Sequence, residues 1–241
     1  MRSRIGTPAG RRAGEGSDIS VEAALVFAGG DPVPLAVAAR LAAGAFVIAA
    51  DSGLAQAVAL GRRVDLVVGD LDSVDLDQLA AARASGTRVE AHPPEKDETD
   101  LELALDAALT RGAEAVTVVG GHGGRLDHLL ANVTVLASPR WAAARIDAWL
   151  GGAYVVVVRD EAALAGEPGS VLSLVALGGT ARGIRTEGLR YPLVDEDLEA
   201  GTSRGVSNEF VGDRARIELR AGTLLAIRPH ALAEAPHPGA R

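Results

Sequence analysis

The feature that most constrains the fold is a regular alternation of apolar runs and helix-like segments over the first half of the chain. Five apolar runs occur at 23–30, 45–53, 64–73, 87–94 and 115–121, and a segment with helix-forming residues follows each of them. Strands that are apolar throughout are buried on both faces, and helices join such strands in βαβ units. The alternation therefore predicts an α/β fold with a mostly parallel sheet and helices on both of its faces.

The pattern changes after about Pro139. Short β-rich segments follow at 145–150, 153–160, 170–177, 180–187, 189–194, 214–220 and 223–228, and Gly-, Pro- or Asp-bearing turns separate them. This spacing predicts an antiparallel, all-β sandwich or barrel. We expect a disordered leader at 1–19, an α/β domain at 20–140 and a β-sandwich domain at 145–232.

Composition excludes several classes of protein. The 241-residue chain has a formal net charge of -8, which argues against a nucleic-acid partner because phosphate backbones bind clustered Lys and Arg. It has no cysteine, so disulfides, thiolate-bound zinc and cysteine nucleophiles are excluded, and a cytoplasmic location fits. The sequence has neither an apolar stretch of membrane-spanning length nor a secretory signal, so we expect no membrane partner.

Acidic residues mark the ends of the second and third apolar runs, at Asp51, Asp70 and Asp72. In an open α/β sheet, ligands bind at the carboxyl ends of the strands, so we expect these side chains to converge on one edge. Asp70 and Asp72 are two residues apart, and on an extended segment this spacing points both side chains to one side. Such a pair is typical of a site for a hard cation such as Mg²⁺, although a solvated turn also explains it.

A second charged segment, at 95–100, begins the helix-like segment at 99–112. Thr99 and Glu102 have the spacing of a capping box, and Asp100 in the first turn suits the helix dipole. Capping does not require the whole run, so Lys96 is a candidate for neutralising phosphate charge, and Asp97 and Asp100 for holding a metal or water. The two interpretations are compatible.

Glycine-rich turns supply two further candidates. In GGHGGRLDH (120–128), glycines before a helix allow backbone N–H groups to approach an anion, and Arg125 suits a phosphate, with Asp127 and His128 close by. Packing or capping explains a lone histidine equally well. In GTSRGVSNEF (201–210), Ser207 and Asn208 lie on a glycine-flanked loop that composition alone would assign to the surface.

Five segments together resemble the thiamine pyrophosphokinase family, especially its bacterial form. They are ADSG (50–53), VVGDLDSV (67–74), EKDETDLELAL (95–105), GGHGGRLDHLLAN (120–132) and RGVSNEF (204–210), in the order found in the family. The resemblance implies an N-terminal nucleotide-binding catalytic domain, a C-terminal β-sandwich that helps to bind thiamine, and a homodimer with thiamine near the interface. It also implies transfer of pyrophosphate from ATP to thiamine, giving thiamine diphosphate and AMP.

The resemblance also implies roles for individual residues. Asp70, Asp72 and Asp100 would be catalytic and hold Mg²⁺ against the ATP phosphates. The nucleotide would be bound by Thr99, Arg125 and Asp127, with Lys96, Asp97 and His128 as further candidates from the same segments. Asp51, Ser207 and Asn208 would lie at the thiamine end. We expect direct in-line attack at the β-phosphorus, with Asp100 or Asp72 accepting the hydroxyl proton.

Two positions depart from the family pattern. Ser52 stands where the family usually has glycine, so the backbone there must accommodate a Cβ. The tryptophan that eukaryotic members place near the end of the β domain is absent, so no aromatic partner for thiamine is assigned. Rival functions are a pyrophosphokinase for another hydroxymethyl heterocycle such as a pterin, a non-catalytic nucleotide- or thiamine-binding protein, and a metal-dependent phosphohydrolase.

Overall fold

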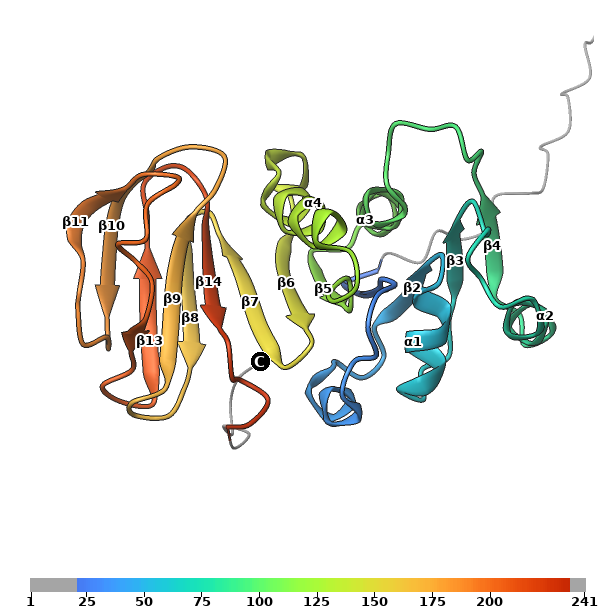
Figure 1. Ribbon diagram of the computed structural model, residues 1–241, viewed down its shortest axis with the longest axis horizontal. Coiled ribbons are helices and arrows are strands. Elements are labelled where there is room, and N and C mark those ends of the chain that lie inside the picture. Colours follow the sequence, from blue (N-terminus) through green and yellow to red (C-terminus); the bar gives the residue numbers. More distant parts are fainter. Residues whose placement is uncertain (1–20, 235–241) are drawn as a thin grey trace, which may run out of the picture.

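The computed structural model describes residues 21–234, so the predicted leader at 1–19 lies outside the described residues. Two sheets form the framework (Figure 1). The first has ten strands in the order β12-β9-β14-β7-β6-β5-β1-β2-β3-β4, and the second has four in the order β11-β10-β13-β8. The first sheet runs through both halves of the chain.

The parallel part of the ten-stranded sheet contains β1 (Ala23–Phe27), β2 (Phe46–Ala50), β3 (Leu66–Gly69), β4 (Arg88–Ala91), β5 (Ala115–Val119) and β6 (Arg145–Leu150). Its antiparallel part contains β7 (Ala153–Val158), β14 (Leu224–Arg228), β9 (Val171–Ala176) and β12 (Asn208–Glu209). The smaller sheet contains β8 (Glu161–Ala165), β10 (Ala181–Glu187), β11 (Val194–Leu198) and β13 (Arg214–Glu218). The predicted fold class is confirmed.

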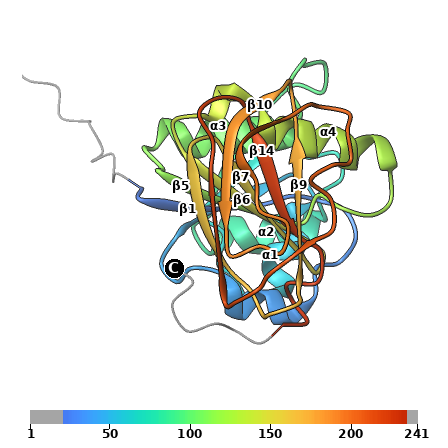
Figure 2. The same cartoon turned by 90° about the vertical axis from the view of Figure 1, so that its left-hand side faces the viewer.

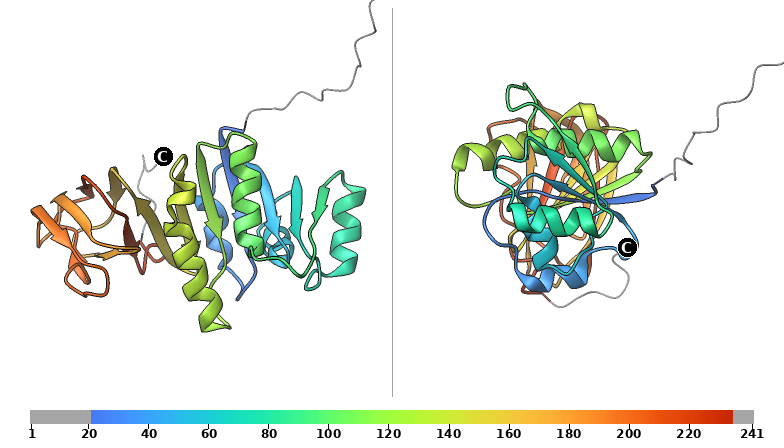
Figure 3. Two further views of the ribbon diagram at one scale, coloured as in Figure 1. Left: turned by 90° about the horizontal axis from the view of Figure 1, so that it is seen from above. Right: turned by 90° about the vertical axis from the view of Figure 1, so that its right-hand side faces the viewer.

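Helices cover both faces of the parallel part (Figures 2 and 3). One face packs against α3 (Asp100–Thr110), α4 (Leu126–Ala137) and the 3-10 turn η2 (Pro139–Trp141). The other packs against the 3-10 helix η1 (Leu35–Arg40), α1 (Gly53–Ala59) and α2 (Leu76–Ala84). Alternate strand residues point to opposite faces, so neighbours such as Leu25 and Val26 belong to different cores, and this explains why the strands are apolar throughout.

A third core lies between the antiparallel part and the smaller sheet. It buries alternate residues of strands such as β9, in which Leu172, Leu174 and Ala176 are buried. The two sheets therefore form the sandwich predicted for the second half. The predicted domain limits at 140 and 145 stay a prediction, since β5 and β6 pair directly across them.

Some predicted elements differ from the structure. The segment 145–150 was expected in an antiparallel sandwich, but β6 pairs in parallel with β5, because α4 and η2 form a crossover between them. The strand expected at 189–194 is displaced to β11, since Pro192 lacks the N–H that a ladder requires. Strand β8 was not expected.

The helix-forming segment after the first apolar run forms only the short 3-10 helix η1. The guanidinium of Arg62 donates to the carbonyl oxygens of Ala38 at 2.9 Å and Leu41 at 3.3 Å. Arg62, which lies outside the segment, thus bonds to the carbonyl oxygens at the end of η1. The backbone of Leu41, which follows η1, is extended. No helix within residues 21–234 is long and apolar enough to cross a membrane.

A polar group is built into the middle of the large sheet. Asp147 on β6 pairs in register with Thr117 on β5 and accepts hydrogen bonds from the hydroxyls of Thr117 and Tyr154. Burial raises the pKa of Asp147 to about 6, although these hydrogen bonds and Arg145 oppose the shift. The Tyr154 ring packs against Trp149 with centroids 4.9 Å apart.

The pKa of Asp147 predicts a pH dependence of stability. Between 3.8 and about 6 the folded protein holds more protons than the unfolded chain, so this carboxyl lowers stability as the pH rises through that window. Asp147→Asn removes the effect, so its free energy of unfolding should rise relative to wild type by up to about 3 kcal/mol between pH 3.5 and 7. Urea denaturation at several pH values measures this difference.

Asp213→Asn is the matched control, because Asp213 is an exposed carboxylate of the same half. Its stability relative to wild type should change much less over the same range. A difference between wild type and Asp147→Asn that stays constant with pH would contradict the prediction.

Candidate active site

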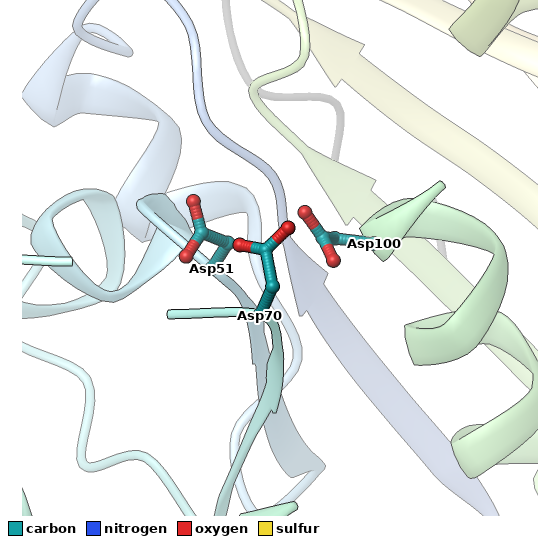
Figure 4. A group of neighbouring side chains, drawn as sticks. All are labelled: Asp51, Asp70 and Asp100. Carbon is teal, nitrogen blue, oxygen red and sulfur yellow. The ribbon is translucent and has the colours of Figure 1, made fainter. Parts of the chain in front are cut away.

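Three carboxylates from separate elements meet at the carboxyl edge of the parallel strands. Asp51 follows β2, Asp70 follows β3, and Asp100 is the first residue of α3. One oxygen from each lies within 4.8 Å of the other two. Figure 4 shows the three side chains pointing toward one another.

The backbone around these residues is shaped to bring them together. Asp51 has a left-handed φ of 47°, and its N–H donates to Val68 O of the neighbouring strand at 2.9 Å. Gly69 has a φ of 146°, and a Cβ there would lie 3.0 Å from Asp100 Oδ1 and 3.1 Å from Asp51 Cβ. Glycine is therefore required, since any side chain would crowd the group.

The electrostatics of this group favour a cation. Asp51 is only 7% exposed, and its Oδ1 is buried without a hydrogen-bond partner among residues 21–234. Burial raises the pKa of Asp51, against a backbone hydrogen bond from Ser52, and the charges of Asp100, Asp70 and Asp72 raise it further. A donor set of carboxylate oxygens fits a hard dication such as Mg²⁺, which would relieve both the repulsion and the unpaired oxygen.

Lys96 is the positive charge nearest to the group. Its Nζ lies 2.7 Å from Asp100 Oδ1 and 3.6 Å from Asp70 Oδ2. Burial alone would lower the pKa of Lys96, but the hydrogen bonds and charges of these two carboxylates raise it. The pKa of Asp70 is lowered, first by a hydrogen bond from the Asp72 N–H and then by Lys96.

Asp72 lies outside the group of three. Leu71 has a left-handed φ of 66°, so the segment from Asp70 to Asp72 is not extended, although the two side chains remain close to one another. The Asp72 N–H donates to Asp70 Oδ1 at 3.2 Å, and the Asp72 carboxylate accepts from the Ser73 hydroxyl at 2.8 Å. A metal-binding role for Asp72 stays a prediction.

Thr99 caps α3 as the sequence predicts. Its hydroxyl accepts from the Glu102 N–H at 3.3 Å, and the Thr99 N–H donates to Glu102 Oε2 at 2.9 Å. The capping box fixes the start of the helix and therefore the position of Asp100. Asp97 is exposed in the preceding loop. Nucleotide contacts of Thr99 and Asp97 stay predictions.

The glycine-rich loop at 120–124 lies beside the loop that follows β1. Gly121 N donates to Gly29 O at 2.7 Å, and Asp31 N donates to His122 O at 2.8 Å. At the start of α4, Arg125 and Asp127 form an exposed ion pair at 2.5 Å, which lowers the pKa of Asp127 to about 2.

His128, also exposed, lies in the first turn of α4. The sequence-predicted nucleotide residues of this segment are thus on the surface, with Arg125 already paired to Asp127. Their contacts with a nucleotide stay predictions.

Gln56 is a positioning residue that the sequence analysis missed. The side chain is 8% exposed and lies on α1. Its Nε2 donates to Gly30 O at 3.2 Å and Asp31 O at 2.8 Å, and its Oε1 accepts from Val33 N at 3.1 Å. It therefore holds the loop after β1 against α1, and that loop is joined to the glycine-rich loop by backbone hydrogen bonds. A polar residue in the middle of an apolar helix face was the only signal in the sequence.

The predicted thiamine residues of the β half are at the far end of the large sheet. Ser207 is exposed with a left-handed φ of 62°, a strained conformation for a residue with a Cβ. Asn208 is buried, and its side chain bonds both the N–H of Tyr191 at 3.0 Å and its carbonyl oxygen at 2.7 Å. Asn208 therefore holds the adjacent loop in place, and direct contact with a ligand stays a prediction.

Two family models match the chain. One described as "Thiamin pyrophosphokinase, catalytic domain" matches residues 38–149, and one described as "Thiamin pyrophosphokinase, vitamin B1 binding domain" matches residues 156–224. The chain is also similar to a thiamine pyrophosphokinase of Bacillus subtilis, with 26% identity over 169 residues that cover 66% of this chain and 76% of that protein.

Solved structures agree with these matches. The thiamine pyrophosphokinase structure from Bacillus subtilis has a TM-score of 0.75 at 24% identity and covers 86% of this chain and 98% of that chain. The family protein from Enterococcus faecalis has a TM-score of 0.71 at 26% identity, covering 90% and 100%. The Candida albicans enzyme shares the fold, with a TM-score of 0.69 at 12% identity, covering 87% and 90%.

The unpaired charge at Asp51 predicts a gain in stability when it is removed. Asp51→Asn keeps the shape of the side chain, and asparagine tolerates a left-handed φ. In EDTA at pH 8 the variant should be more stable than wild type by about 1 kcal/mol, because a buried carboxylate next to two like charges is gone. Denaturant unfolding measures the change.

Added Mg²⁺ supplies the control for this variant. It should raise the stability of wild type more than that of Asp51→Asn, since a ligand that binds only the folded state stabilises it. A variant less stable than wild type in EDTA would show that Asp51 does not carry an uncompensated charge.

Proposed function

The chain belongs to the thiamine pyrophosphokinase family, and we propose that it transfers the terminal pyrophosphoryl group of ATP to the hydroxyethyl oxygen of thiamine. The products are thiamine diphosphate and AMP. The observation that carries the proposal is the group of Asp51, Asp70 and Asp100, with one buried oxygen lacking a partner within residues 21–234. Such a group suits the Mg²⁺ that accompanies ATP.

Residues at the carboxyl edge of the parallel strands would have different roles in this reaction. Asp51, Asp70 and Asp100 would hold Mg²⁺, which supplies charge neutralisation at the triphosphate when bound. Gln56 fixes the loop after β1 to α1, and backbone hydrogen bonds join that loop to the glycine-rich loop after β5. Arg125 is the further cation available to phosphate once its pair with Asp127 opens.

In the proposed step the thiamine hydroxyl oxygen attacks the β-phosphorus, and the bond from that phosphorus to the oxygen bridging the α-phosphate breaks. The bridging oxygen leaves with AMP. The hydroxyl proton passes to a carboxylate, and we assign it to Asp72, because Asp100 belongs to the group of three that would hold Mg²⁺. An acidic edge also attracts the fixed positive charge of thiamine.

A product assay with Asp100→Asn tests the function. Wild-type protein with Mg·ATP and thiamine should form AMP and thiamine diphosphate in equal amounts, separated by chromatography. Asp100→Asn should lose about a thousandfold or more in kcat, because it removes a carboxylate that holds the phosphate-bound cation, while its melting temperature stays near that of wild type. Near-normal turnover would refute the role of Asp100.

The same assay separates the rival functions. ADP with thiamine monophosphate would indicate a simple kinase and exclude attack at the β-phosphorus. Product formed only with a hydroxymethyl pterin would change the acceptor. Binding of thiamine without turnover would indicate a non-catalytic protein. A cytoplasmic location stays a prediction from the sequence.

We further propose that the site is completed by a second copy of the chain. Seven inter-strand spacings separate β12, beside Ser207, from β2, which precedes Asp51. At about 4.8 Å each they place Ser207 on the order of 30 Å from the acidic group, too far for one thiamine molecule to reach both. In Figure 1 the β sandwich and the parallel strands β2 to β4 lie toward opposite ends of the molecule.

Exposed apolar side chains support this dimer. Leu126 and Leu130, one helical turn apart on α4, are 68% and 59% exposed. Val206 and Val211, at 46% and 61%, flank the loop that contains Ser207. Exposed apolar side chains on α4 and beside Ser207 fit an interface in which each copy brings its β end to the acidic edge of its partner.

Subunit complementation tests the shared site. Asp100→Asn and Ser207→Trp homodimers should each be inactive. A co-refolded equal mixture should recover about a quarter of wild-type activity, because half of the dimers are mixed and one of their two sites is intact. If the acidic group and Ser207 served the same site within one chain, or no dimer formed, the mixture would stay inactive. Sedimentation of the wild-type protein checks the oligomeric state.

A further inference from the structure

Lys96 is the only lysine in the chain, and its side chain lies inside the acidic group rather than on the surface. The side chain is 12% exposed, and its ammonium contacts Asp100 at 2.7 Å and Asp70 at 3.6 Å. These are two of the three carboxylates that are placed to hold a cation. The ammonium thus pairs with the same groups that a divalent cation requires.

We propose that Lys96 is a built-in counter-ion that competes with the divalent cation for Asp70 and Asp100, so that metal binds tightly only together with the nucleotide. The inference rests on the proposed function, because the phosphates of the nucleotide supply the new partner for the ammonium. The proposal says that binding of the divalent cation is coupled to binding of the nucleotide. It gives the Lys96 side chain a role in addition to contact with phosphate.

The charges of the group support competition. Three carboxylates meet within 4.8 Å, and one ammonium offsets only part of their charge. Asp51 is left out of this pairing, since its Oδ1 has no hydrogen-bond partner among residues 21–234. The group is therefore attractive to a cation but less so than three free carboxylates would be. A dication entering it is repelled by the ammonium until that charge moves away.

The location of Lys96 allows such a movement. It lies in the loop between β4 and α3, four residues before Asp100, and its N–H bonds only to Pro94 O at 3.1 Å in the same loop. A lysine ammonium is a compact charge on a flexible stem with three donors. Rotation of the side chain moves it from the carboxylates to an anion outside them without displacing the backbone of α3, which the capping box holds.

The triphosphate of a nucleotide provides that anion. Once Lys96 pairs with phosphate oxygens, Asp70 and Asp100 are free for the metal, so nucleotide binding tightens metal binding. By reciprocity the metal tightens nucleotide binding by the same factor. Free Mg²⁺ alone is bound weakly, and the metal enters the site as its nucleotide complex.

Metal titration of the nucleotide-free protein tests the proposal, with Mn²⁺ as the probe and its electron paramagnetic resonance signal as the readout. Lys96→Met keeps an unbranched side chain, one atom shorter, and removes the charge, so Mn²⁺ should bind about tenfold more tightly than to wild type. Lys96→Arg keeps the charge and should leave the dissociation constant within about threefold of wild type. Thermal melts confirm that each variant is folded.

Arg63→Met is the matched control for net charge. Arg63 is 67% exposed and pairs with Asp65 at 3.4 Å, away from the acidic group. Its loss should change Mn²⁺ binding by less than about twofold, since screened surface charges act weakly at a distance. A gain as large as that of Lys96→Met would show a general charge effect and overturn the proposal.

The coupling is measured in the same titration with α,β-methylene ATP, whose α–β link is not cleaved. The analogue should tighten Mn²⁺ binding to wild type about tenfold more than binding to Lys96→Met. Unchanged or weaker Mn²⁺ binding by nucleotide-free Lys96→Met overturns the counter-ion role. If Lys96→Met binds Mn²⁺ no more tightly than wild type and the wild-type protein still forms the products, the counter-ion role is wrong and the proposed function is retained. Tighter binding by Lys96→Met without any wild-type product would refute the function alone.

Discussion

Parallel pairing of β2 with β1 and β3 is the interaction on which the site depends. It brings the ends of β2 and β3 to one edge, so that Asp51 and Asp70 are neighbours although 19 positions separate them in the sequence. The α3 helix, packed across the same strands, adds Asp100 from a third segment. The rigid sheet therefore holds like charges together that would move apart on a flexible chain.

This arrangement costs stability and provides function. A buried carboxylate oxygen at Asp51 without a hydrogen-bond partner among residues 21–234 and the left-handed backbone of the same residue are both unfavourable for folding. Lys96 offsets part of the charge, and the capping box and apolar face of α3 anchor the third carboxylate. The arrangement fits the dication and the anion of the metal-bound nucleotide that we propose as substrate.

Much of the fold follows from periodicity. Continuous apolar strands at 23–27 and 46–50 require two covered faces, and alternating strands such as β9 require one core and one exposed side. Departures arise where distant residues act on a segment. Arg62 ends the 3-10 helix η1, and the crossover through α4 places β6 in parallel beside β5, so one sheet joins both halves. Local sequence contains neither contact.

For the site, the sequence alone determined which acids end strands and begin helices, because turns, caps and apolar runs are local properties. Only the tertiary structure decided which of them meet. Asp72 stays outside the group that Asp70 joins, while Asp51 and Asp100 arrive from other elements. It also decided that Asn208 holds the adjacent loop at Tyr191 and that Gln56 holds the loop after β1. These outcomes depend on distances between segments far apart in the chain, which no local pattern encodes.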